Sequence, residues 1–184
     1  MRRLLINREI NLDANIRCYS FSVANLQKRG LTENDIIPLW RRFKLGEALD
    51  SDLKKSLIEI SKKHNLVVTA GKNHIAKLLA NQGGTVPLGY CDVGTSNQAP
   101  AAGDTNLIAP IAGAREAADD RFTTNNIATI STLFTSSQKQ GVWSESGIFW
   151  DLSGGDMLAR ALFSPTVSHT GSQADLVDWD ITVG

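Results

Sequence analysis

The chain has 184 residues, which is enough for one ordinary domain whose core needs no disulfide or metal support. Its composition, 42% hydrophobic and 21% charged, is typical of a globular protein. No apolar run approaches the roughly 20 residues of a membrane span, which excludes an integral helical membrane protein. After the basic Arg2 and Arg3, the first apolar run lasts three residues, against the about 7–15 of a signal peptide. We therefore expect synthesis in the cytoplasm without export by that route.

The net charge of zero conceals a division between two parts of the chain. Residues 1–80 carry 15 Lys and Arg against 8 Asp and Glu, whereas residues 81–184 carry 4 against 11. Such asymmetry suggests that the halves face different environments. Two solvated surfaces explain it, and so does a basic half that docks on an acidic partner. The basic residues are dispersed and form no stripe of the kind that tracks phosphates, so nucleic acid is not the expected partner.

The first 66 residues combine one strand pattern with helix signals. Residues 11–22 place Leu12, Ala14, Ile16 and Cys18 on one face, which predicts a short strand. Thr32 is placed to cap a helix, and Pro38 would either kink this helix or mark its start. An apolar cluster follows and needs a partner surface, either the rest of the chain or, as we favour, a neighbouring subunit. The cluster consists of Ile36, Ile37, Leu39, Trp40 and Phe43.

A second helix is predicted from Ser51 to about Asn65, because Leu53, Leu57 and Ile60 recur with helical spacing. From residue 66 onward the pattern changes to short alternating segments. One helix interrupts them, with Thr69 as its cap and an end at Gly83-Gly84. The predicted strands are 88–93, 127–134, 142–150, 157–163 and a final strand ending near Val183, with a hairpin turn at 151–156.

These segments predict an α+β chain that is mainly β, an antiparallel and jelly-roll-like β-sandwich with a partly helical N-terminal extension. We expect residues 1–66 to form an arm for assembly and residues 67–184 to form an independently folding sandwich domain. Trp179 is predicted to lie in the sandwich core. Glu145 and Arg160 fall on strands that the hairpin makes neighbours, which predicts a cross-strand ion pair.

Candidate catalytic, cofactor or metal residues do not emerge from the sequence. The histidines His64, His74 and His169 have no ligand spacing with each other or with a cysteine, and we interpret His169 as part of a polar surface turn. The cysteines Cys18 and Cys91 are predicted to be buried free thiols. Three aspartate pairs fit turns or a strand face better than a calcium site. They are Asp119-Asp120, taken as a solvated turn, Asp151 with Asp156, and Asp178 with Asp180.

Residues 67–184 resemble a family of small phage structural proteins found in tail fibres and virions. The matching segments follow a fixed order along the chain. They are 68–72 opening a helix through Leu78-Leu79-Ala80, 88–96, 99–107, Ser144-Glu145-Ser146-Gly147-Ile148-Phe149, 158–165 and 176–183. The resemblance does not extend to the first 66 residues. It implies a β-sandwich and a place in the virion, without deciding between head and tail.

The resulting hypothesis is a non-catalytic subunit of the tail, baseplate or fibre-attachment region, bound to other virion proteins and to copies of itself, since particles are symmetric. Decoration of the head, or a head fibre, is the near alternative. A module that binds host-surface glycans is the alternative of another class. In that case Trp143, Trp150 and Trp179 would stack on sugar rings, although their strand positions favour a core role.

Overall fold

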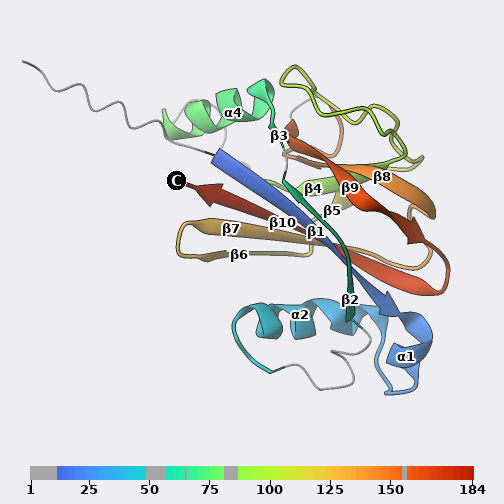
Figure 1. The fold of residues 1–184 in the computed structure, drawn as a ribbon. Helices are drawn as coiled ribbons and strands as arrows, with labels where there is room; N and C mark the ends of the chain where they lie inside the picture. Colours follow the sequence, from blue (N-terminus) through green and yellow to red (C-terminus); the bar gives the residue numbers. More distant parts are fainter. Residues whose placement is uncertain (1–11, 49–56, 65, 81–86, 155–156) are drawn as a thin grey trace, which may run out of the picture.

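The computed structural model describes residues 12–48, 57–64, 66–80, 87–154 and 157–184. Two five-stranded antiparallel sheets pack against each other, with helices at the periphery (Figure 1). The predicted fold class, a mainly β, antiparallel sandwich, is confirmed. Within the described residues, no helix is both long and apolar enough to span a membrane.

The first sheet has the strand order β2-β1-β10-β7-β6. Its strands are β1 (Leu12–Ser22), β2 (Leu57–His64), β6 (Asp120–Thr124), β7 (Ile127–Phe134) and β10 (Gln173–Val183). The first strand pairs with the last over its whole length, from Leu12 opposite Val183 to Ser22 opposite Gln173. The two ends of the described chain are therefore held together at the centre of this sheet.

The second sheet has the order β3-β9-β8-β4-β5. Its strands are β3 (Leu66–Val67), β4 (Tyr90–Gly94), β5 (Glu116–Ala117), β8 (Gly141–Phe149) and β9 (Met157–His169). Strands β8 and β9 form the predicted hairpin. Strands β3 and β9, which pair with each other, both lie between β1 and β10 in the sequence. The pairs β1–β10 and β3–β9 are therefore nested along the chain, and this nesting gives the sandwich its jelly-roll-like character.

The core lies between the inner faces of the sheets. Strand β10 contributes Val177, Trp179 and Ile181 on alternate positions, as expected for side chains that point to one face of a sheet. Trp179 has no exposed surface, so its predicted place in the core is confirmed. Trp143 from β8 and Phe134 from β7 meet edge to face with ring centroids 5.0 Å apart.

Helix α2 (Ile36–Lys44) covers the outer face of the first sheet (Figure 1). It follows the single helical turn η1 (Glu33–Asp35), where the Thr32 N–H donates to Asp35 at 2.7 Å in a capping box. Thr32 thus starts the helical segment as predicted. Pro38 lies in the first turn of α2, where a missing N–H costs nothing. The short α1 (Val23–Gln27) continues directly from β1.

The apolar cluster on α2 packs against this chain's own sheet, which corrects the expectation of a neighbouring subunit. Ile36 and Trp40 are buried, and Ile37, Leu39 and Phe43 are partly buried around them. Their partners on the sheet are Tyr19, Phe21, Leu133, Ala174 and Leu176. Tyr19 and Phe21 alternate with the inward-facing Ala14, Ile16 and Cys18, so they point to the outer face and create the apolar surface that the helix needs.

The helix predicted from Ser51 to Asn65 is wrong where the structure describes it. Residues 57–64 form strand β2, antiparallel to β1 with Phe21 opposite Leu57 and Asn15 opposite His64. Residues 51–56 and Asn65 lie outside the described residues. The helical spacing of Leu57 and Ile60 is overridden because an open edge of β1 offers backbone hydrogen bonds to this segment, and tertiary context outweighs local preference.

The predicted boundary at residue 66 also requires correction. Strands β1 and β2 belong to the same sheet as β10, β7 and β6, so residues 1–66 are no separate arm where they are described. The helix predicted after Thr69 is confirmed as α4 (Thr69–Leu79), whose cap position is Val68. Gly71 lets α4 approach the second sheet, since a Cβ there would lie 2.5 Å from the Leu158 carbonyl oxygen. The predicted end at Gly83-Gly84 lies outside the described residues.

Candidate functional site

The predicted ion pair between Glu145 and Arg160 is the centre of a buried polar network on the second sheet. Glu145 lies on β8 opposite Leu162, and Arg160 lies on β9 opposite Gly147, so the pair runs diagonally across the hairpin. Arg160 Nε donates to Glu145 Oε2 at 2.7 Å, and both side chains are fully buried. The predicted cross-strand pair is therefore confirmed.

The same two side chains hold the long connection between β4 and β5, a role that the sequence did not predict. The Ala109 N–H donates to Glu145 Oε1 at 2.8 Å, and the Ile108 N–H donates to Oε2 at 3.2 Å. Arg160 donates to Asp104 Oδ2 at 3.0 Å and to the Gln98 carbonyl at 2.8 Å. We call this set the Glu145 clasp: Glu145, Arg160, Asp104 and the backbone of residues 98, 108 and 109.

Glycines make room for the clasp. A Cβ on Gly94 would lie 2.5 Å from Glu145 Oε1 and 2.6 Å from the Ala109 carbonyl oxygen, closer than real Cβ contacts come. On Gly147 a Cβ would lie 3.0 Å from Leu107 and from Met157. Gly94 thus allows close packing at the clasp itself, and Gly147 allows close packing against the apolar side chains of Leu107 and Met157.

A second buried ion pair, with its hydrogen bonds, holds the β4–β5 connection at residues further along the chain. Lys139 Nζ donates to Asp92 Oδ1 at 2.9 Å and to the carbonyl oxygens of Ile111 and Gly113 at 2.7 and 3.0 Å. These three acceptors match the three donors of an ammonium group. Burial raises the pKa of Asp92, and the neighbouring Lys139 opposes this shift. The arrangement places the ammonium group where it stabilises two backbone carbonyls of the loop.

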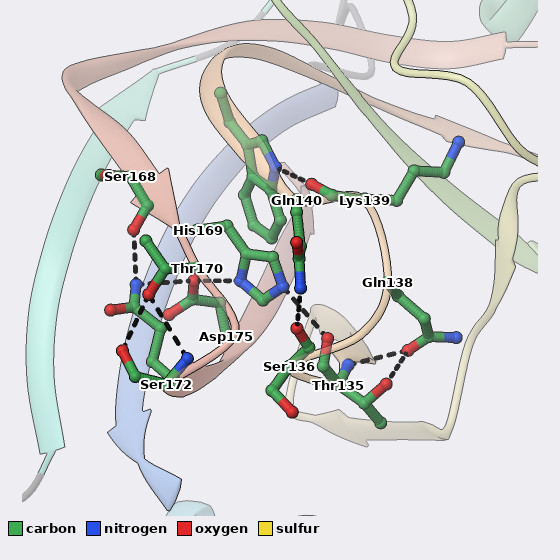
Figure 2. Close-up of polar contacts among 12 residues, drawn as sticks. Thr135, Ser136, Gln138, Lys139, Gln140, Ser168, His169, Thr170, Ser172 and Asp175 are labelled. Carbon is green, nitrogen blue, oxygen red and sulfur yellow. Dashed lines mark hydrogen bonds and ion pairs between the residues drawn. The ribbon is translucent and has the colours of Figure 1, made fainter.

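His169 is buried, which corrects its interpretation as part of a surface turn. It ends β9, with Nδ1 2.6 Å from Asp175 Oδ2 and Nε2 3.0 Å from the Thr135 carbonyl oxygen (Figure 2). A carbonyl oxygen only accepts, so Nε2 carries hydrogen, and a proton lies between Nδ1 and the carboxylate. The ring also stacks on Trp143 with centroids 4.6 Å apart. With both nitrogens engaged, the imidazole at the end of β9 joins the β7–β8 turn to strand β10.

The predicted common face of Asp178 and Asp180 is confirmed, and basic residues of the N-terminal half meet it. Arg17 lies 3.0 Å from Asp180, and Lys44 on α2 lies 3.2 Å from Asp178. Asp178 also accepts from Trp40 Nε1 at 3.0 Å, and burial raises the pKa of this carboxyl. Among the described residues, part of the divided charge of the sequence therefore pairs within one molecule.

Asp120 is buried and bound by Arg41 at 3.2 Å, which corrects the predicted solvated turn at Asp119-Asp120. Asp119 is exposed, but one of its oxygens accepts the Leu133 N–H at 2.7 Å. Arg41 belongs to α2, so this contact adds to those that hold the helix on the sheet.

The remaining candidate residues occupy structural positions. Cys18 and Cys91 are buried free thiols, as predicted. Trp143, Trp150 and Trp179 are all buried, so none offers a ring face to a sugar. His74 stacks on Trp150 with centroids 3.9 Å apart. Within the described residues, no group of three or more His, Cys, Asp or Glu side chains could hold a metal ion.

The following two hollows lie on the surface of the described residues. One is a cleft of about 450 Å³ between the α1–η1 segment and the β7–β8 turn. The other, of about 410 Å³, follows the edge strand β6 and is mainly apolar, with Leu88, Phe122 and Ile130 in its lining. The side chains of the Glu145 clasp line neither hollow.

Fold and site together define a class of protein: an antiparallel β-sandwich whose buried ionic groups fasten long connections onto its sheets. No family model, curated protein or solved structure matches this chain.

Proposed function

We propose that the protein is a non-catalytic structural subunit of a bacteriophage particle, located at the tail, baseplate or fibre-attachment region. Decoration of the head is the alternative location. In either place it would contact other virion proteins and copies of itself, because particles repeat their subunits symmetrically. The proposal rests on where the fold places the segments that resemble phage structural proteins.

The observation that carries the proposal is the meeting of those segments at the Glu145 clasp. Gly94 comes from the segment 88–96, Asp104 from 99–107, Glu145 from 144–149 and Arg160 from 158–165. Three of these segments thus supply side chains to one buried network, and the fourth supplies the glycine that leaves room for Glu145. Ionic groups used in this way hold loops in fixed positions, which suits a surface that must fit neighbouring subunits.

The engagement of the polar groups also favours a structural role over a catalytic one. A general base needs a free lone pair that can reach a substrate. Both nitrogens of His169 are bound within the protein, and the Lys139 ammonium group has three acceptors. Both side chains are also buried, so they contribute to holding the conformation of the protein.

The test is to find the protein in particles. Particles of the phage or prophage that encodes the chain are purified, and gold-labelled antibodies against the recombinant protein are applied in electron microscopy. Label at the tail or baseplate supports the proposal, and label on the head selects the alternative location. Mass spectrometry of the same particles gives the copy number. Particles that lack the chain altogether would refute the proposal.

A further inference from the structure

Lys139 and Asp92 bring a primary amine and a carboxyl group together in a nearly dry part of the molecule. Their side chains are 2% and 7% exposed, and Lys139 Nζ lies 2.9 Å from Asp92 Oδ1. Asp92 belongs to β4, whereas Lys139 lies in the turn between β7 and β8, where its side chain extends away from His169 (Figure 2). The two groups are therefore close in space although they come from distant parts of the chain.

The backbone at Lys139 has a conformation that this residue type rarely adopts. Its φ of +46° lies in the left-handed region, which glycine enters freely and which costs other residues free energy. The Trp143 indole N–H donates to the Lys139 carbonyl oxygen at 2.7 Å and holds this conformation. Backbone strain of this kind is concentrated at functional positions. The turn thus accepts strain at a position that aims a lysine side chain at Asp92.

Backbone groups hold the amine and the carboxyl group in place. The carbonyl oxygens of Ile111 and Gly113 accept from Lys139 Nζ at 2.7 and 3.0 Å. On the other side, the Val93 N–H donates to Asp92 Oδ1 at 2.9 Å. Well-oriented reacting groups within one molecule reach effective concentrations of about 10⁵–10⁸ M. The nitrogen and the carboxyl group are therefore positioned for a reaction with each other.

Burial also favours an amide over an ion pair. In water, hydration of an ammonium and a carboxylate stabilises them against condensation, and a buried pair loses this hydration. A closed site also excludes the water that would reverse the reaction. Burial raises the pKa of Asp92, and the neighbouring Lys139 opposes this shift. The Asp92 carboxyl group therefore takes up a proton, which condensation requires, more readily than an exposed aspartate does.

We propose that Lys139 and Asp92 join in an intramolecular isopeptide bond after the chain has folded. The ammonium group first gives one proton to Asp92 Oδ2. The Nζ lone pair then attacks Cγ to form the N–C bond, and the Val93 N–H stabilises the charge that develops on Oδ1. A second Nζ proton moves to Oδ2, the Cγ–Oδ2 bond breaks, and one water molecule leaves. The third proton remains as the amide N–H, for which the Ile111 carbonyl oxygen is the nearest acceptor.

The bond links β4 to the β7–β8 turn and closes residues 92–139 into a ring. This ring contains β5 of the second sheet and β6 and β7 of the first sheet, so it ties the two layers of the sandwich together. The two cysteines of the chain are both free thiols, and no disulfide supplies such a tie. A covalent ring restricts the unfolded chain as a disulfide does. The inference goes beyond the proposed function and does not depend on it.

The first measurement is the mass of the full chain, purified, kept for days at neutral pH and then denatured. We expect a mass lower than that of the sequence by one water molecule. Trypsin should release residues 78–115 joined to residues 122–160, with cleavage after Lys139 blocked. A mass equal to that of the sequence would overturn the inference. Loss of water with the two peptides separate, as succinimide formation at an aspartate gives, would overturn it as well.

Two lysine variants identify the reacting amine. Lys139→Arg keeps the positive charge without a primary amine, so it should keep the full mass of its sequence. The matched control is Lys44→Arg, because Lys44 lies 3.2 Å from Asp178 but its side chain is 15% exposed. This control should lose one water molecule as the wild type does. A joined pair of peptides in Lys139→Arg, or none in Lys44→Arg that melts cooperatively, would contradict the assignment. A particle subunit without the bond fails only here, and a bonded chain absent from particles fails only the proposed function.

Discussion

Variants of the Glu145 clasp can test whether Glu145 and Arg160 only form a buried ion pair or also hold the β4–β5 connection in place. Replacing Arg160 by Met leaves the Glu145 carboxylate buried without its cation. Removal of one partner from a buried pair costs about 3–5 kcal/mol, a large share of the about 5–15 kcal/mol that stabilises a domain. The converse variant Glu145→Leu leaves the guanidinium group with Asp104 alone as its ionic partner. We expect the free energy of unfolding of each single variant to be lower than that of wild type by about 3–5 kcal/mol.

The double variant Glu145→Leu/Arg160→Met distinguishes the two readings. A simple buried pair replaced by apolar side chains of similar volume is often neutral or stabilising. Here Glu145 also accepts from the N–H groups of Ile108 and Ala109. A donor left unsatisfied costs about 1–3 kcal/mol if it stays buried. We therefore expect the free energy of unfolding of the double variant to remain lower than that of wild type by about 1–3 kcal/mol or more.

Urea unfolding followed by tryptophan fluorescence provides the free energies, with unchanged m-values as the sign that the folded state stays compact. The exposed pair of Arg42 and Glu47, 2.6 Å apart, is the matched control. Glu47→Gln should change stability by about 0–1 kcal/mol. A double clasp variant as stable as wild type would refute the loop-fastening role. Single variants within about 1 kcal/mol of wild type would refute the clasp itself.

Four further predictions follow from burial and topology. Trp179→Ala should lower the free energy of unfolding by about 3–5 kcal/mol, measured by the same titration, because the ring is fully buried. Burial raises the pKa of Cys91 to about 12 and that of Cys18 in the same direction, so at pH 8 neither thiol should react with a disulfide reagent until denaturant is added. Gly94→Ala should cost about 1–3 kcal/mol in the same titration, because its Cβ would overlap oxygen atoms at 2.5 and 2.6 Å. The fragment 67–184, which lacks β1 and β2, should be insoluble or melt without cooperativity in calorimetry, and a monomer that melts cooperatively would contradict the pairing of β1 with β10.

The sequence predicted those elements whose signal is local. Alternation over residues 127–134 and the turn before Met157 identified strand β7 and the β8–β9 hairpin, because side chains of a strand point to alternate faces. The same locality explains the error at residues 57–64. An edge strand is selected by an unpaired neighbour, here β1, which lies about forty residues away and leaves no trace in the local spacing.

The site could be predicted only in part for a related reason. Glu145 and Arg160 are brought together by one hairpin, so their pairing was visible in the sequence. Their other partners are distant: the contact from Arg160 to the Gln98 carbonyl spans 62 residues, and that from Glu145 to Ile108 spans 37. His169 was misread because its partners include the Thr135 carbonyl oxygen, a backbone group that every residue possesses and that carries no sequence signal.

The divided charge of the chain is best understood through the pairing of its first and last strands. The register places Arg17 opposite Asp178 and Asn15 opposite Asp180, so an acidic C-terminal strand lies directly beside a strand that bears a cation. Helix α2 then covers part of the outer face of this sheet and brings Lys44 to Asp178 on β10 and Arg41 to Asp120 on β6. Opposite charges at the two ends of the sequence favour this closure, since like charges on adjacent strands would oppose it. Within the described residues, Arg17, Arg41 and Lys44 of the basic part therefore meet acidic partners inside the fold.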